Sequence, residues 1–343
     1  MGTAITDIIT SKEISIVNLK GKILAVDSYN MLYQFLSTIR QRDGSLLKDS
    51  KGRVTSHLTG LFNRVINLMG RELKFVFVFD GKVPELKKEE RTRRKNLKKE
   101  ARKKYEKAKK QEDEEDMKKY ASRTSVLTSG MVEQAKKLIT ALGMPVVQAP
   151  SEGEAQAARM VQNGDCYAVL SQDADALIFG APRVIKNLSI TKRRKKANAL
   201  TYKKINPELI ILSETLNELG MTRQQLIVLA MLVGTDYNVG GVKGIGPKTA
   251  IKLLKEYGED FDSLFEKAEW EEHSEYDWKE IFSLIKNMKK SDDYELEWKD
   301  VDREEVINLL VKEHDFSQDR VESSLDKLQD SIDKEQKGLG DFF

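Results

Sequence analysis

Short apolar runs that alternate with helical patterns constrain the fold of this chain more than any other feature of its sequence. Four runs predict strands, at 22–26, 75–79, 145–147 and 167–170. Apolar residues spaced three or four apart predict helices at 30–40, 55–69, 131–142 and 154–161. Such alternation is typical of an α/β fold in which helices flank a mostly parallel central sheet.

From residue 206 onward the spacing of apolar residues is helical. It predicts helices at 209–219, 223–233, 248–257, 278–288 and 304–312. We therefore expect a helical subdomain to follow the sheet.

The composition excludes several classes of protein. The only cysteine, Cys166, cannot form an intramolecular disulfide, and no cluster of cysteine and histidine has the spacing of a zinc site. No apolar run approaches the roughly 18 residues that a membrane-spanning helix needs. We therefore expect an intracellular protein that binds no membrane, located in the cytoplasm or nucleoid, or in the nucleus if the source is eukaryotic.

Charge is distributed unevenly along the chain. Its 58 basic residues nearly cancel its 55 acidic residues, so the net charge does not name a partner. Basic residues nevertheless dominate 82–110, and 183–204 contains no acidic residue. The segment 85–117 has few apolar residues and no proline or glycine, which predicts either a solvated helical insertion or a contact with phosphate.

Acidic residues follow the predicted strands at the points where the strands end. The set comprises Asp27, Asp80, Glu152, Glu154, Asp173 and Asp175. Because the functional crevice of an open α/β sheet lies at the carboxyl ends of its strands, we expect these side chains to converge. Converging carboxylates repel one another unless hard divalent cations such as Mg²⁺ or Mn²⁺ neutralise them. The sequence therefore predicts a pair of metal ions, which can hydrolyse a phosphodiester without a protein nucleophile.

Each of these acids also has a structural interpretation. Asp27 and Asp173 have the positions of helix N-caps, and Asp80 precedes a glycine as in a turn. The segment 151–154 has the sequence of a capping box. Two pairs of acids spaced two residues apart, together with two strand-end aspartates, exceed what capping requires, so we favour the metal site.

A glycine–hydrophobe–glycine turn formed by Gly244 and Gly246 precedes a predicted helix, which is the pattern of a helix-hairpin-helix. Backbone N–H groups at such a turn can hold a DNA phosphate, with Lys243 and Lys248 adding positive charge. The alternative is an ordinary helix–helix turn. Pro247 interrupts a Walker A loop, which argues against nucleotide hydrolysis.

Seven short stretches extend over nearly the whole chain and carry a resemblance to a known family. They lie at 25–28, 33–36, 55–58, 78–82, 149–155, 171–175 and 233–237. Through them the chain resembles the flap endonucleases of the XPG-type structure-specific 5′ nuclease family. The resemblance implies a PIN-like fold with a helical arch and a helix-hairpin-helix subdomain. We expect an archaeal source, because no longer basic tail follows the last motif.

The activity implied by the resemblance is hydrolysis of a 5′ flap at the junction of single-stranded and double-stranded DNA. Two Mg²⁺ ions per active site are implied as cofactors, for which Mn²⁺ can substitute. The expected roles are DNA replication, including Okazaki fragment processing, and DNA repair, with associated 5′–3′ exonuclease activity. Within the enzyme class, a 5′ exonuclease or a nuclease of repair bubbles competes with this interpretation. Outside it, the alternative is a non-catalytic DNA-binding sliding-clamp adaptor.

The resemblance also assigns roles to individual residues. The implied metal ligands are Asp27, Asp80, Glu152, Glu154, Asp173, Asp175 and Asp236. The implied catalytic residues are Lys87, Arg94, Asp27, Asp80, Glu152 and Asp175. Because Lys87 and Arg94 are seven residues apart, they lie on one face of a helix. The implied DNA contacts are Tyr33, Arg40, Thr55, Arg64, Lys243, Gly244, Gly246, Lys248 and Thr249, with Tyr33 matching the base-stacking residue.

The resemblance divides the chain into five regions. They are an N-terminal nuclease region at 1–98, a helical arch insertion at 86–120, an internal nuclease region at 121–258 with the helix-hairpin-helix at about 234–258, C-terminal helices at 259–329, and a flexible tail at 330–343.

The last residues of the chain resemble a clamp-binding box. Gln336, Leu339, Phe342 and Phe343 match its glutamine, hydrophobic and aromatic positions, which implies that the tail binds a PCNA-type sliding clamp. The alternative is a disordered tail that ends in phenylalanines by chance. The other expected partner is branched DNA with a 5′ flap, bound by a monomer. We expect the basic cluster 192–196 to contact duplex phosphates, with a localisation signal as the alternative.

Overall fold

A seven-stranded sheet forms the centre of the molecule, and the computed structural model describes residues 4–111, 113–188, 193–195, 202–204 and 206–340. The strands have the order β1-β9-β6-β5-β2-β3-β4. They are β1 (Lys12–Glu13), β2 (Ile23–Asp27), β3 (Lys74–Phe79), β4 (Val146–Gln148), β5 (Ala168–Leu170), β6 (Arg183–Lys186) and β9 (Glu208–Ile211). From β4 to β6 all neighbouring strands are parallel, whereas β9 and β1 pair antiparallel. The prediction of a mostly parallel sheet is confirmed.

The central strands are buried on both faces, and their side chains alternate between two cores. Along β3, Phe75, Phe77 and Phe79 enter one cluster of buried apolar residues, whereas Val76 and Val78 enter the other. This period of two follows from the pleat of a strand, and continuous apolar runs are typical of parallel strands that are covered on both sides. Because burial fixes the register, β2, β3, β4 and β5 end at the same edge of the sheet.

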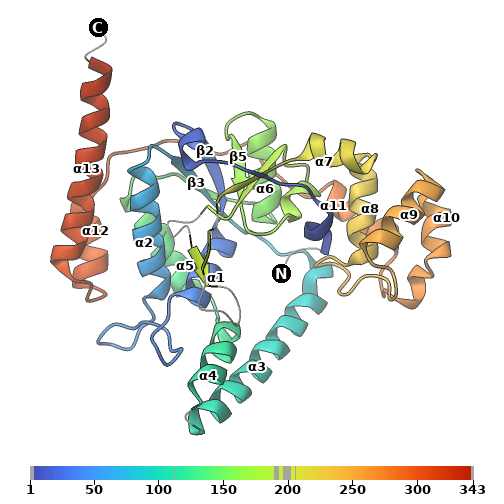
Figure 1. The fold of residues 1–343 in the computed structure, drawn as a ribbon, viewed down its shortest axis with the longest axis horizontal. Helices are drawn as coiled ribbons and strands as arrows, with labels where there is room; N and C mark the ends of the chain where they lie inside the picture. The colour runs from blue at the N-terminus through green and yellow to red at the C-terminus, as the bar shows by residue number, and fades with distance from the viewer. Residues whose placement is uncertain (1–3, 112, 189–192, 196–201, 205, 341–343) are drawn as a thin grey trace.

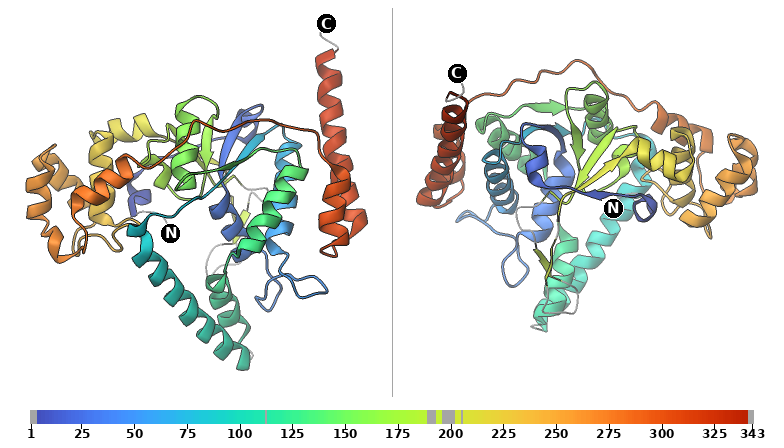
Figure 2. Two further views of the ribbon diagram at one scale, coloured as in Figure 1. Left: turned by 180° about the vertical axis from the view of Figure 1, so that it is seen from behind. Right: turned by 45° about the horizontal axis from the view of Figure 1, so that its top comes forward.

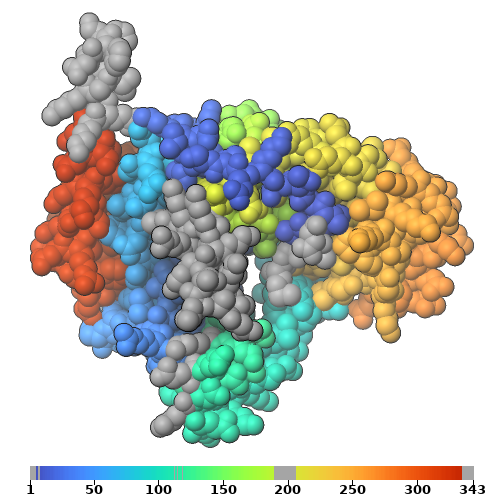
Figure 3. Space-filling view, in the orientation of Figure 1, coloured from blue at the N-terminus to red at the C-terminus, as the bar shows by residue number. Residues whose placement is uncertain are grey.

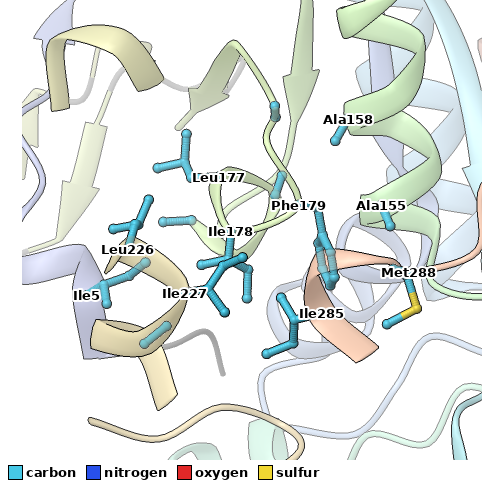
Figure 4. Packing of buried hydrophobic residues seen from close by; sticks show 14 of the residues in the cluster. Ile5, Ala155, Ala158, Leu177, Ile178, Phe179, Leu226, Ile227, Ile285 and Met288 are labelled. Carbon is cyan, nitrogen blue, oxygen red and sulfur yellow. The ribbon is translucent and has the colours of Figure 1, made fainter. Parts of the chain in front are cut away.

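Helices cover both faces of the sheet (Figure 1). The face that carries Phe77 packs against α1 (Ser28–Thr38), α2 (Ser56–Met69), α5 (Ser129–Ala141), α12 (Arg303–Ile307) and α13 (Gln318–Gly340). The opposite face packs against α6 (Gly153–Gln162) and α8 (Arg223–Val233). Figure 4 shows part of this second core, in which Phe179 lies near Ala155 of α6 and Ile178 near Ile227 of α8.

A helical subdomain lies beside the sheet (Figure 1). It contains α7 (Leu212–Leu219), α9 (Pro247–Tyr257), α10 (Phe261–Lys267) and α11 (Trp278–Lys286). The extended chain 288–302 then crosses the back of the molecule and joins this subdomain to α12 (Figure 2). Among the described residues, no helix is both long and apolar enough to cross a membrane.

Short elements complete the described chain. They are η1 (Ala4–Ile8), η2 (Ile16–Leu19), η4 (Ser122–Thr124), η5 (Asp175–Leu177), η6 (Trp270–Glu272), the π-helical turn η7 (Asn308–Lys312), and a hairpin of β7 (Arg193–Lys195) and β8 (Tyr202–Lys204).

Two helices project from the body of the molecule (Figures 1 and 3). After η3 (Glu85–Lys87), α3 (Lys88–Lys110) leads away from the body and α4 (Glu114–Ala121) packs beside it. We call η3, α3 and α4 the arch. Although α3 is mostly charged, apolar side chains at the contact between the two helices are buried and hold them together. These side chains are Ala101, Ala108, Met117 and Ala121.

The structure differs from the sequence predictions in three segments. The segment 209–219 begins as strand β9, because its β-branched residues pair with β6, and only α7 is helical. Residues 304–312 divide into α12 and the π-helical turn η7. In the segment from residue 330, where we expected a flexible tail, α13 continues as far as Gly340.

Candidate active site

Seven acidic side chains from the body of the protein line one cavity of about 780 Å³, whose other wall is formed by the arch and includes Glu100. They are Asp27, Asp80, Glu152, Glu154, Asp173, Asp175 and Asp236. The strand order explains the convergence, because β5, β2, β3 and β4 are neighbours that end at one edge of the sheet. Asp236 reaches the same cavity from the loop after α8. The structure thus brings together every acid that was predicted to bind metal.

Asp27 ends β2 and also caps the next helix. Its Oδ1 accepts a hydrogen bond of 3.0 Å from the backbone N–H of Asn30, so the predicted N-cap is present. The hydroxyl of Ser171 lies 3.3 Å from Oδ2 of Asp27 and 3.4 Å from Oε1 of Glu154. Asp27 therefore fixes the start of α1 and faces the cavity at the same time.

Asp80 follows β3 and holds the N-terminus of α6. Its Oδ1 accepts a hydrogen bond of 2.7 Å from the N–H of Gly153. A Cβ atom on residue 153 would lie 2.8 Å from this oxygen, so any other residue at this position would displace the carboxylate of Asp80. The predicted capping box is absent, because Glu152 makes no side-chain cap and the Ser151 hydroxyl donates to the carbonyl of Lys82 instead.

Burial and mutual repulsion raise the free energy of the ionised carboxylates and so raise their pKa values. Burial raises the pKa of Asp27 to about 7, and the charge of Asp80 adds to this shift. Burial also raises the pKa of Asp80 to about 6, with Glu152 adding to it. The pKa of Glu154 is raised as well, first by burial and then by Asp175 and Asp27. A group of acids in this state is stabilised when a cation enters.

Two basic side chains of the arch enter this group of acids. Lys87 Nζ lies 2.8 Å from Oε2 of Glu152 and 3.0 Å from Oδ2 of Asp236. Arg94 Nη2 lies 2.7 Å from the other oxygen of Asp236, Oδ1. Burial opposes the charged form of Asp236, but Lys87 and then Arg94 hold its pKa below the usual value. Lys87 and Arg94 therefore share one side of the arch and reach a single carboxylate.

Glu90 positions the guanidinium groups of the arch, and the sequence analysis missed it. Glu90 is only 2% exposed, and its carboxylate accepts hydrogen bonds from Arg93 and Arg94. The spacing of three and four residues along α3 was the available signal for these pairs. Because Arg94 is held by both Glu90 and Asp236, its position depends on the helix and on the body of the protein together.

Asn30 and Ser171 were also missed. Asn30 donates a hydrogen bond of 2.9 Å from Nδ2 to Oδ2 of Asp173, and its Oδ1 accepts one of 3.3 Å from the N–H of Gln172. The contacts of Ser171 join acids from β2 and α6. Both residues act between strands that are distant in sequence, so no local pattern indicates them.

The donor set fits a hard divalent cation. Such ions prefer carboxylate oxygens, and Oε1 of Glu152 is buried with no hydrogen-bond partner in the part of the chain that the structure describes. In this structure Lys87 contacts Glu152, and Arg94 contacts Asp236. Among the described residues, no group of three His, Cys, Asp or Glu side chains is arranged to hold an ion. A metal ion would therefore compete with these two basic side chains for the carboxylates.

Tyr33 projects from α1 into the same cavity. Its ring is half-buried, and Nζ of Lys98 on α3 lies 4.7 Å from the ring centroid. The cavity thus contains an aromatic ring next to a cation of the arch, near the acids.

The other predicted DNA contacts of the N-terminal region are tied into the protein. Arg40 donates a hydrogen bond of 2.6 Å to the hydroxyl of Ser125, which follows η4. The guanidinium of Arg64 lies 4.8 Å from the ring centroid of Phe35, and burial lowers its pKa to about 10. Thr55 is only 5% exposed, so its side chain is not offered to DNA in this structure.

The predicted glycine hairpin is not part of the cavity wall. Gly244 has a φ of +84°, a left-handed conformation that favours glycine, and Gly246 is the N-cap residue of α9. Lys243, Lys248 and Thr249 are exposed, and the first turn of α9 contains no acidic residue. This helix start therefore has the charge and the exposed backbone that suit an anion.

Part of the predicted clamp-binding box lies outside the described residues. Gln336 and Leu339 belong to the backbone of α13, whereas Phe342 and Phe343 are not described.

Parts of the basic stretch 183–204 form strands. Its first residues form β6, where Arg183 donates a hydrogen bond of 2.6 Å to the carbonyl of Tyr167 and stacks over that ring. These two contacts tie Arg183 to Tyr167 within the fold. Within the cluster 192–196, Arg193–Lys195 forms β7, and the two flanking lysines lie outside the described residues.

Comparison with known proteins decides the family. Residues 3–101 match the XPG N-terminal domain, and residues 143–236 match the XPG I-region. Over 332 residues the chain is 50% identical to Flap endonuclease 1 of Pyrococcus abyssi, which covers 97% of this chain and 95% of that protein. The chain belongs to the flap endonuclease family of XPG-type nucleases.

Solved structures agree with membership in the flap endonuclease family. Flap endonuclease-1 from Methanococcus jannaschii is 44% identical and has a TM-score of 0.76, covering 97% of this chain and 100% of that one. The catalytic core of Rad2 in complex with DNA substrate, 24% identical with a TM-score of 0.71, shares the fold over 95% of this chain and 100% of that one. The predicted resemblance and α/β fold are confirmed. Membership identifies the chain as a nuclease, and the family implies dependence on divalent metal ions.

Proposed function

We propose that this protein is a structure-specific 5′ flap endonuclease, which hydrolyses one phosphodiester where single-stranded and double-stranded DNA meet. It would act in DNA replication, including Okazaki fragment processing, and in repair, with associated 5′–3′ exonuclease activity. The observation that best supports this function is the meeting of seven carboxylates with Lys87 and Arg94 in one cavity beneath the arch. A single-stranded 5′ end that passes the arch would bring its phosphate to both sets of charges.

The cofactors we propose are two Mg²⁺ ions held by the seven carboxylates, for which Mn²⁺ can substitute. When bound, such a pair polarises a phosphoryl oxygen and activates water for an in-line displacement. The chain's own basic residues supply the rest of the charge stabilisation. Lys87 and Arg94 already face the carboxylates, so a phosphate that enters the cavity meets their positive charges and replaces Glu152 and Asp236 as their partners.

Contacts other than those with the acids position the DNA. We propose that a base next to the cleaved bond stacks on Tyr33, whose ring lies in the cavity. The hairpin around Gly244 and Gly246 would hold a phosphate of the duplex with its backbone N–H groups. The exposed side chains of Lys243, Lys248 and Thr249 add charge and hydrogen-bond donors at the same place.

Further proposals concern partners and location. The C-terminal tail, through Gln336, Leu339, Phe342 and Phe343, would bind a PCNA-type sliding clamp. The enzyme would work as a monomer on branched DNA inside the cell, where replication takes place.

The test of this function is incubation of the purified protein with a labelled double-flap DNA, with Mg²⁺ and with EDTA, beside a matched 3′-flap DNA. We expect Mg²⁺-dependent release of the 5′ flap alone. Binding of DNA without cleavage under any divalent metal would overturn the proposal and favour a non-catalytic sliding-clamp adaptor.

A further inference from the structure

Two large uncharged side chains of the arch, Leu97 and Tyr120, line the cavity. Leu97 on α3 is 46% exposed, and Tyr120 on α4 is half-buried. Both line the cavity that contains the seven acids. Apolar surface that stays in water contributes nothing to folding, so Leu97 is available to bury its surface against a ligand.

The cavity extends from the acids along one face of α3 towards α4. Arg94, Leu97, Ala101 and Lys104 line it, with the spacing of three and four residues that defines one side of a helix. At the rise of an α-helix, Arg94 and Lys104 are about 15 Å apart along the axis. Because stacked nucleotides of one strand are about 3.4 Å apart, this distance corresponds to about four nucleotides. A strand whose phosphate reaches the acids therefore has room to continue past Leu97 to Tyr120.

Two lysines lie near the ring of Tyr120. Lys104 Nζ lies 5.7 Å and Lys119 Nζ 5.1 Å from its centroid. Within the same cavity, Lys98 of α3 lies over the ring of Tyr33 of α1 in the same way. Aromatic rings paired with lysines match single-stranded nucleic acid, because its bases offer open faces for stacking and its phosphates pair with the cations. Bases inside a duplex are already stacked and offer no such face.

We propose that Leu97 and Tyr120 form a second base-contact site in the arch, which holds an unstacked base of the single-stranded 5′ flap beyond the nucleotide at Tyr33. The inference rests on the proposed function and specifies where the arch touches the flap. The base stacks on Tyr120 and its edge packs against Leu97. Neither side chain lies among the acids, so both bind the strand and take no part in hydrolysis of the phosphodiester.

Fluorescence of 2-aminopurine tests the contact directly. The probe base is placed at successive positions of the flap in a double-flap DNA, and the DNA is bound in Ca²⁺ to the full chain carrying Asp175→Ala, so that cleavage is prevented. We expect quenching at one flap position that Tyr120→Ala removes and Tyr120→Phe retains. Leu97→Ala should weaken it, whereas Val126→Ala, which changes an exposed apolar residue outside the cavity wall, serves as the matched control. The same quenching profile with Tyr120→Ala would overturn the inference.

Kinetics in Mg²⁺ separate a base contact from a structural role. With otherwise native protein, Tyr120→Ala should reduce cleavage of a flap about tenfold more than cleavage of a nicked duplex without a flap, the size expected for one stacked base. Equal losses on both substrates, with a lower melting temperature, would show that Tyr120 only supports α4 and would overturn the inference. If the unmutated protein cleaved no flap at all, the proposed function would fail instead, so the two failures are distinguishable.

Discussion

Lys87 Nζ lies 2.8 Å from Oε2 of Glu152, so a cation from the base of the arch lies within the group of acids that ends the central strands. Burial opposes the charge of Lys87, but Glu152 and Asp236 outweigh it and raise the pKa of the lysine above its usual value. The ammonium group therefore stays charged at neutral pH. A fixed positive charge at this point can stabilise the charge that develops on a phosphate during its cleavage.

Replacing Lys87 with alanine tests this role. We expect Lys87→Ala to slow cleavage about 10²- to 10³-fold, the usual effect of removing one group that stabilises transition-state charge. The measurement is the single-turnover rate on a double-flap DNA at saturating enzyme. Lys88→Ala removes an exposed lysine next to it and should leave the rate near that of the native protein. An unchanged rate for Lys87→Ala would remove this residue from catalysis.

Glu90 provides a second test, because it holds Arg94 from within the arch. Glu90→Ala should reduce the single-turnover rate, but less than Arg94→Ala, since Asp236 still contacts the guanidinium. Glu90→Gln should recover part of the loss by accepting hydrogen bonds again. The matched control is Glu89→Ala, which removes the same charge from an exposed position. Equal rates for the Glu89 and Glu90 variants would contradict a positioning role.

The local sequence was enough to predict where Asp27 and Asp80 lie, because each follows a short apolar run that forms a buried parallel strand. It was not enough for β9, whose pattern over 209–219 also fits a helix and is decided by pairing with β6. The hydrogen bond from Asn30 to Asp173 joins residues 143 positions apart, so only the folded sheet reveals it. Local patterns thus predict elements and strand ends, whereas contacts across the sheet depend on the tertiary fold.

A buried chain of hydrogen bonds joins α2, α5 and the segment before α13. His57 Nε2 lies 3.1 Å from Oε1 of Gln134, whose Nε2 lies 3.1 Å from Nε2 of His314. His314 Nδ1 lies 3.0 Å from Oδ2 of Asp49. Burial lowers the pKa of His57 to about 4, so this imidazole is neutral in the folded protein at neutral pH.

This shift predicts a pH dependence of stability. The pKa of His57 is lower when folded than its ordinary value of 6.5, so the unfolded chain takes up the proton first as the pH falls. The contribution of neutral His57 is complete above pH 6.5 and is lost as the pH approaches 4, by at most about 3 kcal/mol. His57→Gln cannot titrate but can still donate to Gln134. The stability difference between native protein and variant, measured by urea unfolding, should therefore shrink between pH 7.5 and 4.5, and a constant difference would contradict the assignment.

The C-terminal tail makes a separable prediction. Deleting residues 336–343 should leave cleavage by the free enzyme intact, because no described residue of this segment lines the cavity. The same deletion should remove stimulation of cleavage by a PCNA-type clamp, measured in a titration with clamp loaded on the DNA. Replacing Phe342 and Phe343 together with alanine should reproduce the loss. Stimulation that survives both changes would rule out the tail as the clamp-binding segment.

The most direct test of the carboxylate site is Asp175→Ala, assayed for both cleavage and binding. We predict that this variant loses Mg²⁺-dependent flap cleavage in single-turnover assays, because one of the seven acids proposed to hold the metal ions is gone. Its affinity for the same double-flap DNA, measured by fluorescence anisotropy, should remain close to that of the native protein, because the glycine hairpin and the arch are unchanged. Full cleavage activity in Asp175→Ala would contradict the assignment of this cavity as the active site.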